Sequence, residues 1–205
     1  MTTRVELSPS QVQRLVERAR SGDTLAFDEL VSLYMDKIYS YVARMVGDPS
    51  EAEDIAQETF VKAFRNIKSF RGASSFQTWL YRIASNLTID AVRRRKRREN
   101  TISLDAPVEG GDAGQITREL EDVTLAGPSG RLETAELQRH VHRAIQELSP
   151  KLRAVVVLYE LQGLSYEEIA EILRCPLGTV KSRLFNARME LKEKLRDILA
   201  ESDGG

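Results

Sequence analysis

The strongest constraint on the fold is a helical apolar pattern between residues 76 and 91. Apolar side chains recur there at steps of three and four residues, which is the spacing of one buried face of an α-helix. The members are Phe76, Trp79, Leu80, Ile83, Ala84, Leu87 and Ala91. The pattern predicts an amphipathic helix and excludes a strand, which would alternate every second residue. Ser74, with Gln77 three residues later, is typical of a capping box and predicts the helix start.

The same stretch concentrates positive charge. Residues 69–98 hold eight basic side chains and one acid, a local charge of +7, and Arg93 to Arg98 are six cations in a row. Consecutive cations repel each other and usually imply an anionic partner, although a solvated helix end is the alternative. Aromatic rings beside cations suit single-stranded nucleic acid, because bases stack and phosphates are neutralised. Asn86 lies at the edge of the buried stripe, where its amide can offer donors and acceptors to a base.

Helical spacing also predicts three helices before residue 69. The first begins at Ser8 and Pro9 and stops at Gly22, and the second is long, broadly apolar and ends near Gly47. A third, with Ser50 and Glu53 as a capping box, runs through residue 67. Its expected buried residues are Ala52, Ala56, Phe60, Ala63, Phe64 and Ile67. Together with the helix from residue 76, these predict one all-α domain over residues 5–98.

The opposite side of the third helix carries a mostly polar stripe. Its members are Asp54, Gln57, Glu58, Val61 and Arg65. The acids near the helix start have a simple alternative explanation, since negative charge there is favoured by the helix dipole. Val61 within an otherwise polar stripe favours a protein contact surface.

Residues 99–131 differ in composition from both flanks. They show no sustained periodicity and are rich in Gly, Pro and acidic residues, which predicts a flexible acidic linker. Two roles are open for its charge: solubility alone, or screening of the basic domain and passage through a positive channel.

The second helical pattern covers residues 132–200. Leu137 to Leu148 form one apolar face, Ser149 and Pro150 begin another helix, and Ser165 with Glu168 forms a capping box. A tight turn at Cys175 leads to a long helix with Leu177, Val180, Leu184, Ala187, Leu191 and Leu195 expected to be buried. A short helix, a tight turn and a longer helix are typical of a helix-turn-helix, although an ordinary helical hairpin is the alternative. Phe185 on the polar, basic face favours DNA, because thymine methyls or sugars could cover its ring.

Composition argues against several kinds of site. Cys175 is the only cysteine, so an internal disulfide and a CxxC site are excluded. His140 and His142 are two residues apart and point to different sides of a helix, so we expect no zinc and no other cofactor. No His, Cys and carboxylate set resembles a catalytic site, which argues against an enzyme. Because the first residues lack the apolar core of a signal peptide, we expect a cytoplasmic protein.

Four sequence blocks, in order, carry a family resemblance: AFDELVSLY, EAEDIAQETFVKAFRNIKSFRG, FQTWLYRIASNLTIDAVRRRKR and LSYEEIAEILRCPLGTVKSRLFNAR. The chain resembles the extracytoplasmic-function (group IV) sigma factors of the sigma-70 family, and most of all the envelope-stress, sigma-E-like type. The resemblance implies an all-α fold with a sigma-2 and a sigma-4 domain, joined by the linker and without catalytic chemistry.

The family also implies roles for individual residues. Asp54, Gln57, Glu58, Val61 and Arg65 would bind core RNA polymerase at the β′ clamp helices, with the β flap as a second contact. The −10 element would be read and held by Phe70, Arg71, Ser75, Trp79, Arg82, Asn86, Arg93, Arg94, Arg95 and Arg97. The −35 duplex would be bound by Thr179, Lys181, Ser182, Arg183, Phe185, Asn186 and Arg188. Asn186 departs from envelope-stress relatives, which often have Arg there, so the −35 sequence does not carry over.

The expected partners are therefore core RNA polymerase, promoter DNA as a −35 duplex and a single-stranded −10 element, and an anti-sigma factor. Such an anti-sigma factor is often membrane-bound and would hold the chain at the inner membrane face. Two other functions compete: a free-standing helix-turn-helix regulator, and a helical adaptor that binds only proteins. The adaptor leaves both basic helices unexplained.

Overall fold

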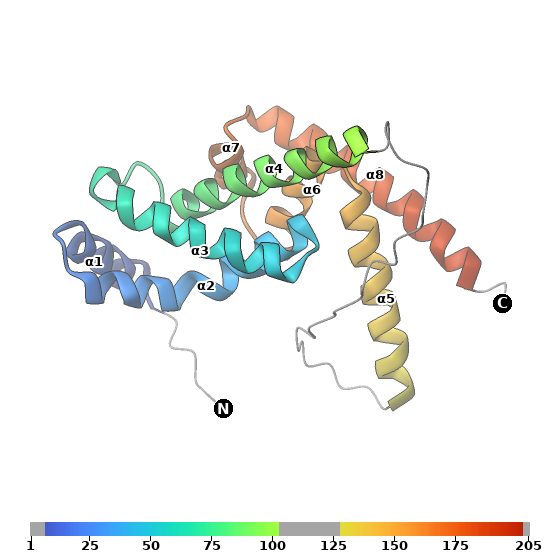
Figure 1. Ribbon diagram of the computed structural model, residues 1–205, viewed down its shortest axis with the longest axis horizontal. Coiled ribbons are helices and arrows are strands. Elements are labelled where there is room, and N and C mark those ends of the chain that lie inside the picture. Colours follow the sequence, from blue (N-terminus) through green and yellow to red (C-terminus); the bar gives the residue numbers. More distant parts are fainter. Residues whose placement is uncertain (1–6, 103–127, 203–205) are drawn as a thin grey trace.

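A computed structural model of the 205-residue chain describes residues 7–102 and 128–202. The elements are α1 (Pro9–Arg20), α2 (Thr24–Val46), α3 (Pro49–Asn66), a 3₁₀ turn η1 (Ile67–Ser69), α4 (Phe76–Ile102), α5 (Pro128–Glu147), α6 (Pro150–Val156), a π-helical turn η2 (Val157–Leu161), α7 (Tyr166–Leu173) and α8 (Leu177–Ser202). All described elements are helical, so the predicted all-α class is confirmed (Figure 1). Helix α4 extends into the predicted linker and α5 begins before its predicted end. Residues 103–127 lie outside the described part.

Several predicted helix ends are confirmed by their hydrogen bonds. The Ser8 hydroxyl accepts from the Gln11 amide at 3.3 Å, and the Gln11 side chain accepts from the Ser8 amide at 2.7 Å. Ser165 and Glu168 form the same reciprocal box at the start of α7. Gly47 ends α2 with φ at 79°, a left-handed conformation that glycine adopts without steric cost.

Two predicted caps are wrong by one or two residues. Helix α3 is capped by Asp48, whose Oδ1 accepts from the Glu51 amide at 2.7 Å, and not by Ser50. The reason is Pro49, which suits the first helical position because it has no N–H group, so the residue before it becomes the cap. Helix α4 is capped by Ser75, whose hydroxyl accepts from the Thr78 amide at 3.0 Å, and not by Ser74.

Helix α2 is the centre of the first half and packs against α1, α3 and α4. Tyr41 from α2 and Tyr81 from α4 are buried and meet edge to face, with ring centroids 5.5 Å apart. The Tyr41 hydroxyl is satisfied by the Ser85 hydroxyl at 2.8 Å. A ring contact and a buried hydrogen bond therefore fix α4 to α2.

Three residues expected in the core are instead exposed. Phe64 is 49% exposed, Leu137 48% and Leu177 37%. Phe64 touches the edge of the Phe27 ring, with centroids 5.0 Å apart, so one side is covered while the other meets solvent. A period of 3.6 residues places each of them near a boundary of its apolar stripe, where spacing alone does not decide burial.

The predicted helix-turn-helix is confirmed as α7, a tight turn and α8. Arg174 occupies the turn in the left-handed region, with φ at 49°, and its amide bonds back to Ala170. The π-helical turn η2 was not predicted, because apolar spacing alone does not separate it from a continued α-helix.

The two halves of the chain are in contact. Helix α4 packs along α6 and α7, and α2 packs against α5 (Figure 1). Buried residues from both halves belong to one continuous hydrophobic cluster. The two predicted domains therefore share an interface, which the sequence pattern did not indicate.

Candidate nucleic-acid and protein interfaces

The polar stripe on α3 forms an exposed surface. Its predicted members Asp54, Gln57, Glu58, Val61 and Arg65 are all exposed, and Val61 is 47% exposed. Sequence analysis placed Phe64 in the core, but its 49% exposure three residues after Val61 adds a second apolar group to this surface. The three-residue step from Val61 to Phe64, which puts both residues on one side of the helix, could have predicted this from the sequence. Exposed apolar groups within a polar stripe are typical of a protein contact.

Phe70 is buried rather than available to a base. The side chain is 5% exposed, and its ring lies 5.1 Å from that of Trp79 and 6.0 Å from that of Phe76. The expected stacking role therefore does not fit this arrangement. The ring instead anchors the loop that follows, where Arg71 is exposed and Ser75 caps α4.

The predicted −10 residues on α4 divide by exposure. Asn86 is exposed, whereas Trp79 and Arg82 are half-buried. Arg93, Arg94 and Arg97 at the basic end of the helix are exposed. Arg95 is half-buried, and its Nη1 lies 3.4 Å from the Glu51 carboxylate of α3. Arg95 therefore forms an ion pair with an acidic residue of its own chain.

Asn86 also borders a cleft between the two halves. The cleft, of about 310 Å³, has Asn86, Asp90 and Arg93 on the α4 side. Its other lining residues include Lys151, Arg174, Cys175 and Arg183. Four of these seven side chains are cationic and one is acidic, so the cleft favours anions. Sequence analysis missed it because its walls lie far apart along the chain.

Cys175, in the predicted turn before α8, is half-buried in the wall of this cleft. The Arg183 Nη1 atom points to its sulfur at 3.7 Å. Arg183, a predicted −35 residue, is thus half-buried and turned towards the cleft.

The other predicted −35 residues lie on the outer face of α8. Lys181, Ser182, Phe185 and Asn186 are exposed, and Phe185 is 65% exposed. Thr179 is half-buried, and its carbonyl accepts from the Ser182 hydroxyl at 3.1 Å. This face combines a cation, small polar groups and a ring, a combination suited to phosphates and base edges in a major groove.

Arg188 differs from its neighbours. Its Nε and Nη2 atoms donate to Glu160 Oε1 at 2.9 and 2.6 Å, and its guanidinium lies 5.5 Å from the centre of the Tyr159 ring. The pair with Glu160 raises the pKa of Arg188 above its ordinary value. Arg188 is therefore engaged within the chain, which the sequence did not indicate.

The described part of the chain also bears on metal binding and membrane insertion. Within the described residues, no three His, Cys, Asp or Glu side chains gather as ligands of a metal ion would. None of the described helices combines the length and apolar character needed to cross a membrane.

Comparison with known proteins identifies the two halves. A model of sigma-70 region 2 matches residues 30–98, and a model of sigma-70 region 4 matches residues 138–191. The RNA polymerase sigma-H factor of Pseudomonas aeruginosa is 41% identical over 96% of this chain and 100% of its own length. The ECF RNA polymerase sigma-E factor of Escherichia coli K12 is 42% identical over 91% of this chain and 95% of its own. The chain belongs to the ECF sigma factors. This sigma factor is thus a transcription initiation factor, and the resemblance drawn from its four sequence blocks is confirmed.

Solved structures of related proteins agree with this assignment. The sigma factor RpoE of Bartonella quintana, in complex with the anti-sigma factor NepR, is 26% identical with a TM-score of 0.61, over 83% of this chain and 96% of that one. CnrH in complex with the cytosolic domain of CnrY has a TM-score of 0.63 at 24% identity, over 89% of this chain and 96% of that one. This second likeness supports the fold of the sigma factor.

Proposed function

We propose that this sigma factor binds core RNA polymerase and directs initiation at promoters that carry a −35 and a −10 element. The observation that carries the proposal is the order of regions 2 and 4 in one chain, each with an exposed surface of matching chemistry. Residues 5–98 would form the polymerase-binding and −10 domain, and residues 132–200 the −35 domain. We further propose that the chain has no catalytic activity of its own and acts in the cytoplasm.

The α3 stripe is the proposed contact with the β′ clamp helices. Val61 and Phe64 provide apolar area, and Asp54, Glu58 and Arg65 provide charges that fix orientation. An apolar centre with charges around it is the common anatomy of a protein interface. The −35 domain would contact the β flap.

The outer face of α8 is the proposed −35 reader. Lys181 would neutralise a phosphate, while Ser182 and Phe185 would contact base edges and a thymine methyl. Asn186 stands where envelope-stress relatives often have Arg. An amide pairs best with adenine and a guanidinium with guanine. We therefore propose that the base preferred at this position of the −35 element differs from the base preferred by relatives with Arg.

The Asn86 face of α4 is the proposed −10 reader. Extruding a base from the duplex costs a few kcal/mol, which stacking at ~1–3 kcal/mol per base and phosphate contacts can offset. Asn86 would recognise the base, the loop with Arg71 and Ser75 would hold it, and the arginines at the end of α4 would bind the backbone. No nucleotide hydrolysis is needed for this opening.

An anti-sigma factor is the proposed regulatory partner. The Bartonella quintana RpoE structure contains one, NepR, and its sigma chain aligns along 83% of this chain. A membrane-bound anti-sigma factor would hold this chain at the inner membrane face.

In vitro transcription with purified core enzyme tests the proposal. Lys181→Ala should lose −35-dependent initiation and keep core binding, whereas Asn86→Ala should weaken open complexes, seen by permanganate footprinting, more than closed complexes, seen by gel shift. Failure of the parent chain to bind core polymerase or to direct a start site would overturn the proposal. Tight specific binding of promoter duplex without polymerase would instead favour a free-standing helix-turn-helix regulator.

A further inference from the structure

The cleft beside Asn86 is lined by cations that are not paired with acids. Arg93 lines it from α4, and Lys151, Arg174 and Arg183 line it from the second half. Within residues 7–102 and 128–202, none of these four side chains forms an ion pair with a carboxylate. The Arg183 Nη1 atom lies 3.7 Å from the Cys175 sulfur, which is a weak acceptor. The positive charge of the cleft is therefore available to a ligand.

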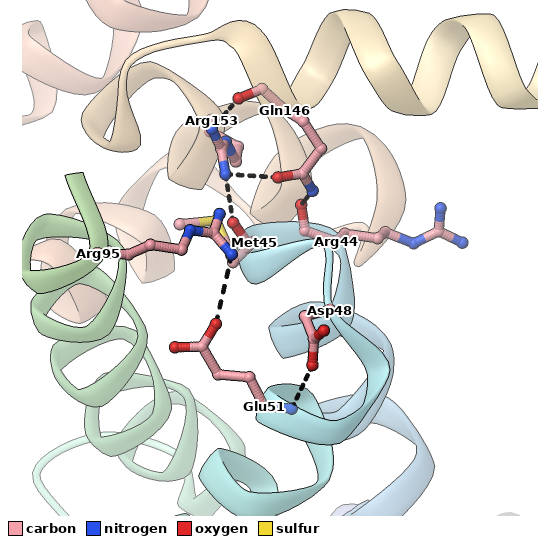
Figure 2. A network of polar contacts seen from close by, with 7 residues as sticks. All are labelled: Arg44, Met45, Asp48, Glu51, Arg95, Gln146 and Arg153. Carbon is pink, nitrogen blue, oxygen red and sulfur yellow. Dashed lines mark hydrogen bonds and ion pairs between the residues drawn. The ribbon is translucent and has the colours of Figure 1, made fainter. Parts of the chain in front are cut away.

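Cations elsewhere at the interface are compensated by groups of the chain. Figure 2 shows Arg95 of α4 beside the Glu51 carboxylate, at 3.4 Å. It also shows Arg153 of α6, which is 5% exposed and donates to the Met45 carbonyl and to the side chain of Gln146. A buried cation is costly unless its hydrogen bonds are made, and here the chain makes them. The four cations of the cleft differ, because their compensation must come from outside the described part of the chain.

The backbone that carries these cations is held in place. Lys151 and Ala154 of α6 line the cleft, and Arg153 between them ties α6 to the end of α2. Arg174 lies in the tight turn between α7 and α8, in the left-handed region with φ at 49°. The cleft therefore exists before a ligand binds, and a preformed site loses less conformational freedom on binding.

The rest of the lining suits a small molecule. Ile89, Ala154 and Leu173 provide apolar surface, and the Asn86 amide provides both donors and an acceptor. Asp90 is the one carboxylate among the described residues that line the cleft. The volume of about 310 Å³ is at the lower end of the range of roughly 300–1,000 Å³ that is typical of small-molecule sites. The cleft therefore fits a small ligand with several negative charges.

We propose that this cleft binds a small anion that carries a pyrophosphate group. Two linked phosphates offer several strong acceptor oxygens, and guanidinium groups match phosphate oxygens in pairs. A single monovalent anion would leave most of the four cations without a counter-charge. The group can belong to inorganic pyrophosphate or to a nucleoside diphosphate, whose base would lie on the apolar side of the cleft. The site does not depend on the proposed function.

Titration calorimetry of the full chain tests the ligand class. Inorganic pyrophosphate and ADP are titrated separately, with adenosine as the control that lacks phosphates. We expect one binding event per chain for pyrophosphate or for ADP, and none for adenosine. Binding of ADP at least about tenfold tighter than pyrophosphate would identify the nucleotide as the source, and equal binding would identify the pyrophosphate group alone. Failure of both to bind would overturn the proposal, as would equal binding of adenosine and ADP.

Two cations of the cleft can be removed without touching a residue assigned to DNA or polymerase. Lys151→Gln combined with Arg174→Asn should weaken binding at least about tenfold, because charged hydrogen bonds are lost. Asn is chosen for Arg174 because it tolerates the left-handed conformation. Lys192→Gln is the matched control, an exposed lysine of α8 outside the lining, and it should leave the affinity unchanged.

Asp90→Asn should change the affinity in the opposite direction. It removes the carboxylate that repels an anion in the cleft, so binding should become tighter by several-fold. Damage to the fold would not tighten binding, so the two opposite changes separate local charge from stability. An affinity that neither the double variant nor Asp90→Asn alters would overturn the assignment to this cleft.

Cys175 reports where the anion binds. It is the only cysteine of the chain, is half-buried and lines the cleft. With pyrophosphate at ten times its Kd, about one chain in eleven is unoccupied, so alkylation by uncharged N-ethylmaleimide should be about tenfold slower. An unchanged rate under conditions where calorimetry shows binding would place the anion elsewhere and overturn the proposal. Because neither measurement uses polymerase or promoter DNA, failure to direct a start site would overturn the proposed function and leave this site in place.

Discussion

Arg188 lies against Glu160, with two of its nitrogens donating to one carboxylate oxygen at 2.9 and 2.6 Å. The same guanidinium lies over the Tyr159 ring, which stacks on Tyr166 with centroids 4.9 Å apart. Lys181, on the same helix, is exposed. The two cations of the proposed −35 face therefore differ: Lys181 is exposed, whereas Arg188 is held by Glu160 and Tyr159 of its own domain.

This difference predicts different salt dependences. Each phosphate contact adds roughly 0.9 to the slope of log affinity against log salt concentration. Lys181→Ala should lower the slope for a −35 duplex by about 1, whereas Arg188→Ala should leave it unchanged, because Arg188 already has its counter-charge. Fluorescence anisotropy of holoenzyme with labelled duplex over a salt series measures both. A slope reduced equally by Arg188→Ala would place that arginine on a phosphate.

The features that could be predicted from sequence are local ones. The Ser8 and Ser165 capping boxes and the turn before α8 depend on residues within a few positions of each other. Their hydrogen bonds are made within one turn, so spacing and residue type are enough. The exposure of Lys181 and Phe185 followed from the same periodicity.

The features that were missed depend on contacts between distant segments. Glu160 and Arg188 are separated by 28 positions, and Met45 and Arg153 by 108. The family resemblance implied a −10 contact for Phe70, yet its ring is buried against the rings of Phe76 and Trp79. Periodicity indicates which face of a helix is apolar, but it does not indicate which element covers that face. The cleft beside Asn86 could not be predicted, because it depends on which elements pack together.

Val61 gives a direct test of the α3 surface. Because its side chain is 47% exposed, Val61→Ser should cost little stability in the free chain. Lost apolar burial should weaken core polymerase binding about tenfold, which is ~1.4 kcal/mol. Leu137→Ser, at a residue 48% exposed in the other half, is the matched control. Competition for core enzyme against a labelled sigma factor measures both, and equal affinities would argue against the α3 contact.

Substitution of Phe70 should reduce the stability of the fold more than it reduces open-complex formation. Truncating a buried ring to Ala typically costs about 3–5 kcal/mol. Phe70→Ala should therefore lower the free energy of unfolding by about that amount, which moves the midpoint of urea unfolding to a much lower concentration. Phe70→Leu should retain most of the stability and still form open complexes, since Asn86 and Arg71 are untouched. Trp79, the only tryptophan, lies 5.1 Å from the Phe70 ring and reports unfolding by fluorescence. A stable Phe70→Leu protein without open complexes would restore a direct role for the ring in base capture.

His142 should make the interface sensitive to acid. Although the residue is exposed overall, desolvation of its imidazole lowers its pKa below 6.5, and the positive charges of Arg44 and Arg153 lower it further. Near pH 6 the folded chain therefore binds fewer protons than the unfolded chain, so stability falls as the pH drops below 6.5.

The melting temperature should accordingly decrease between pH 7.5 and 5.5, because protonation adds a third positive charge beside Arg44 and Arg153. His142→Asn should flatten this decrease, whereas His140→Asn should leave it in place. A parent chain whose melting temperature stays constant over this range would show that the ring is not desolvated at the interface.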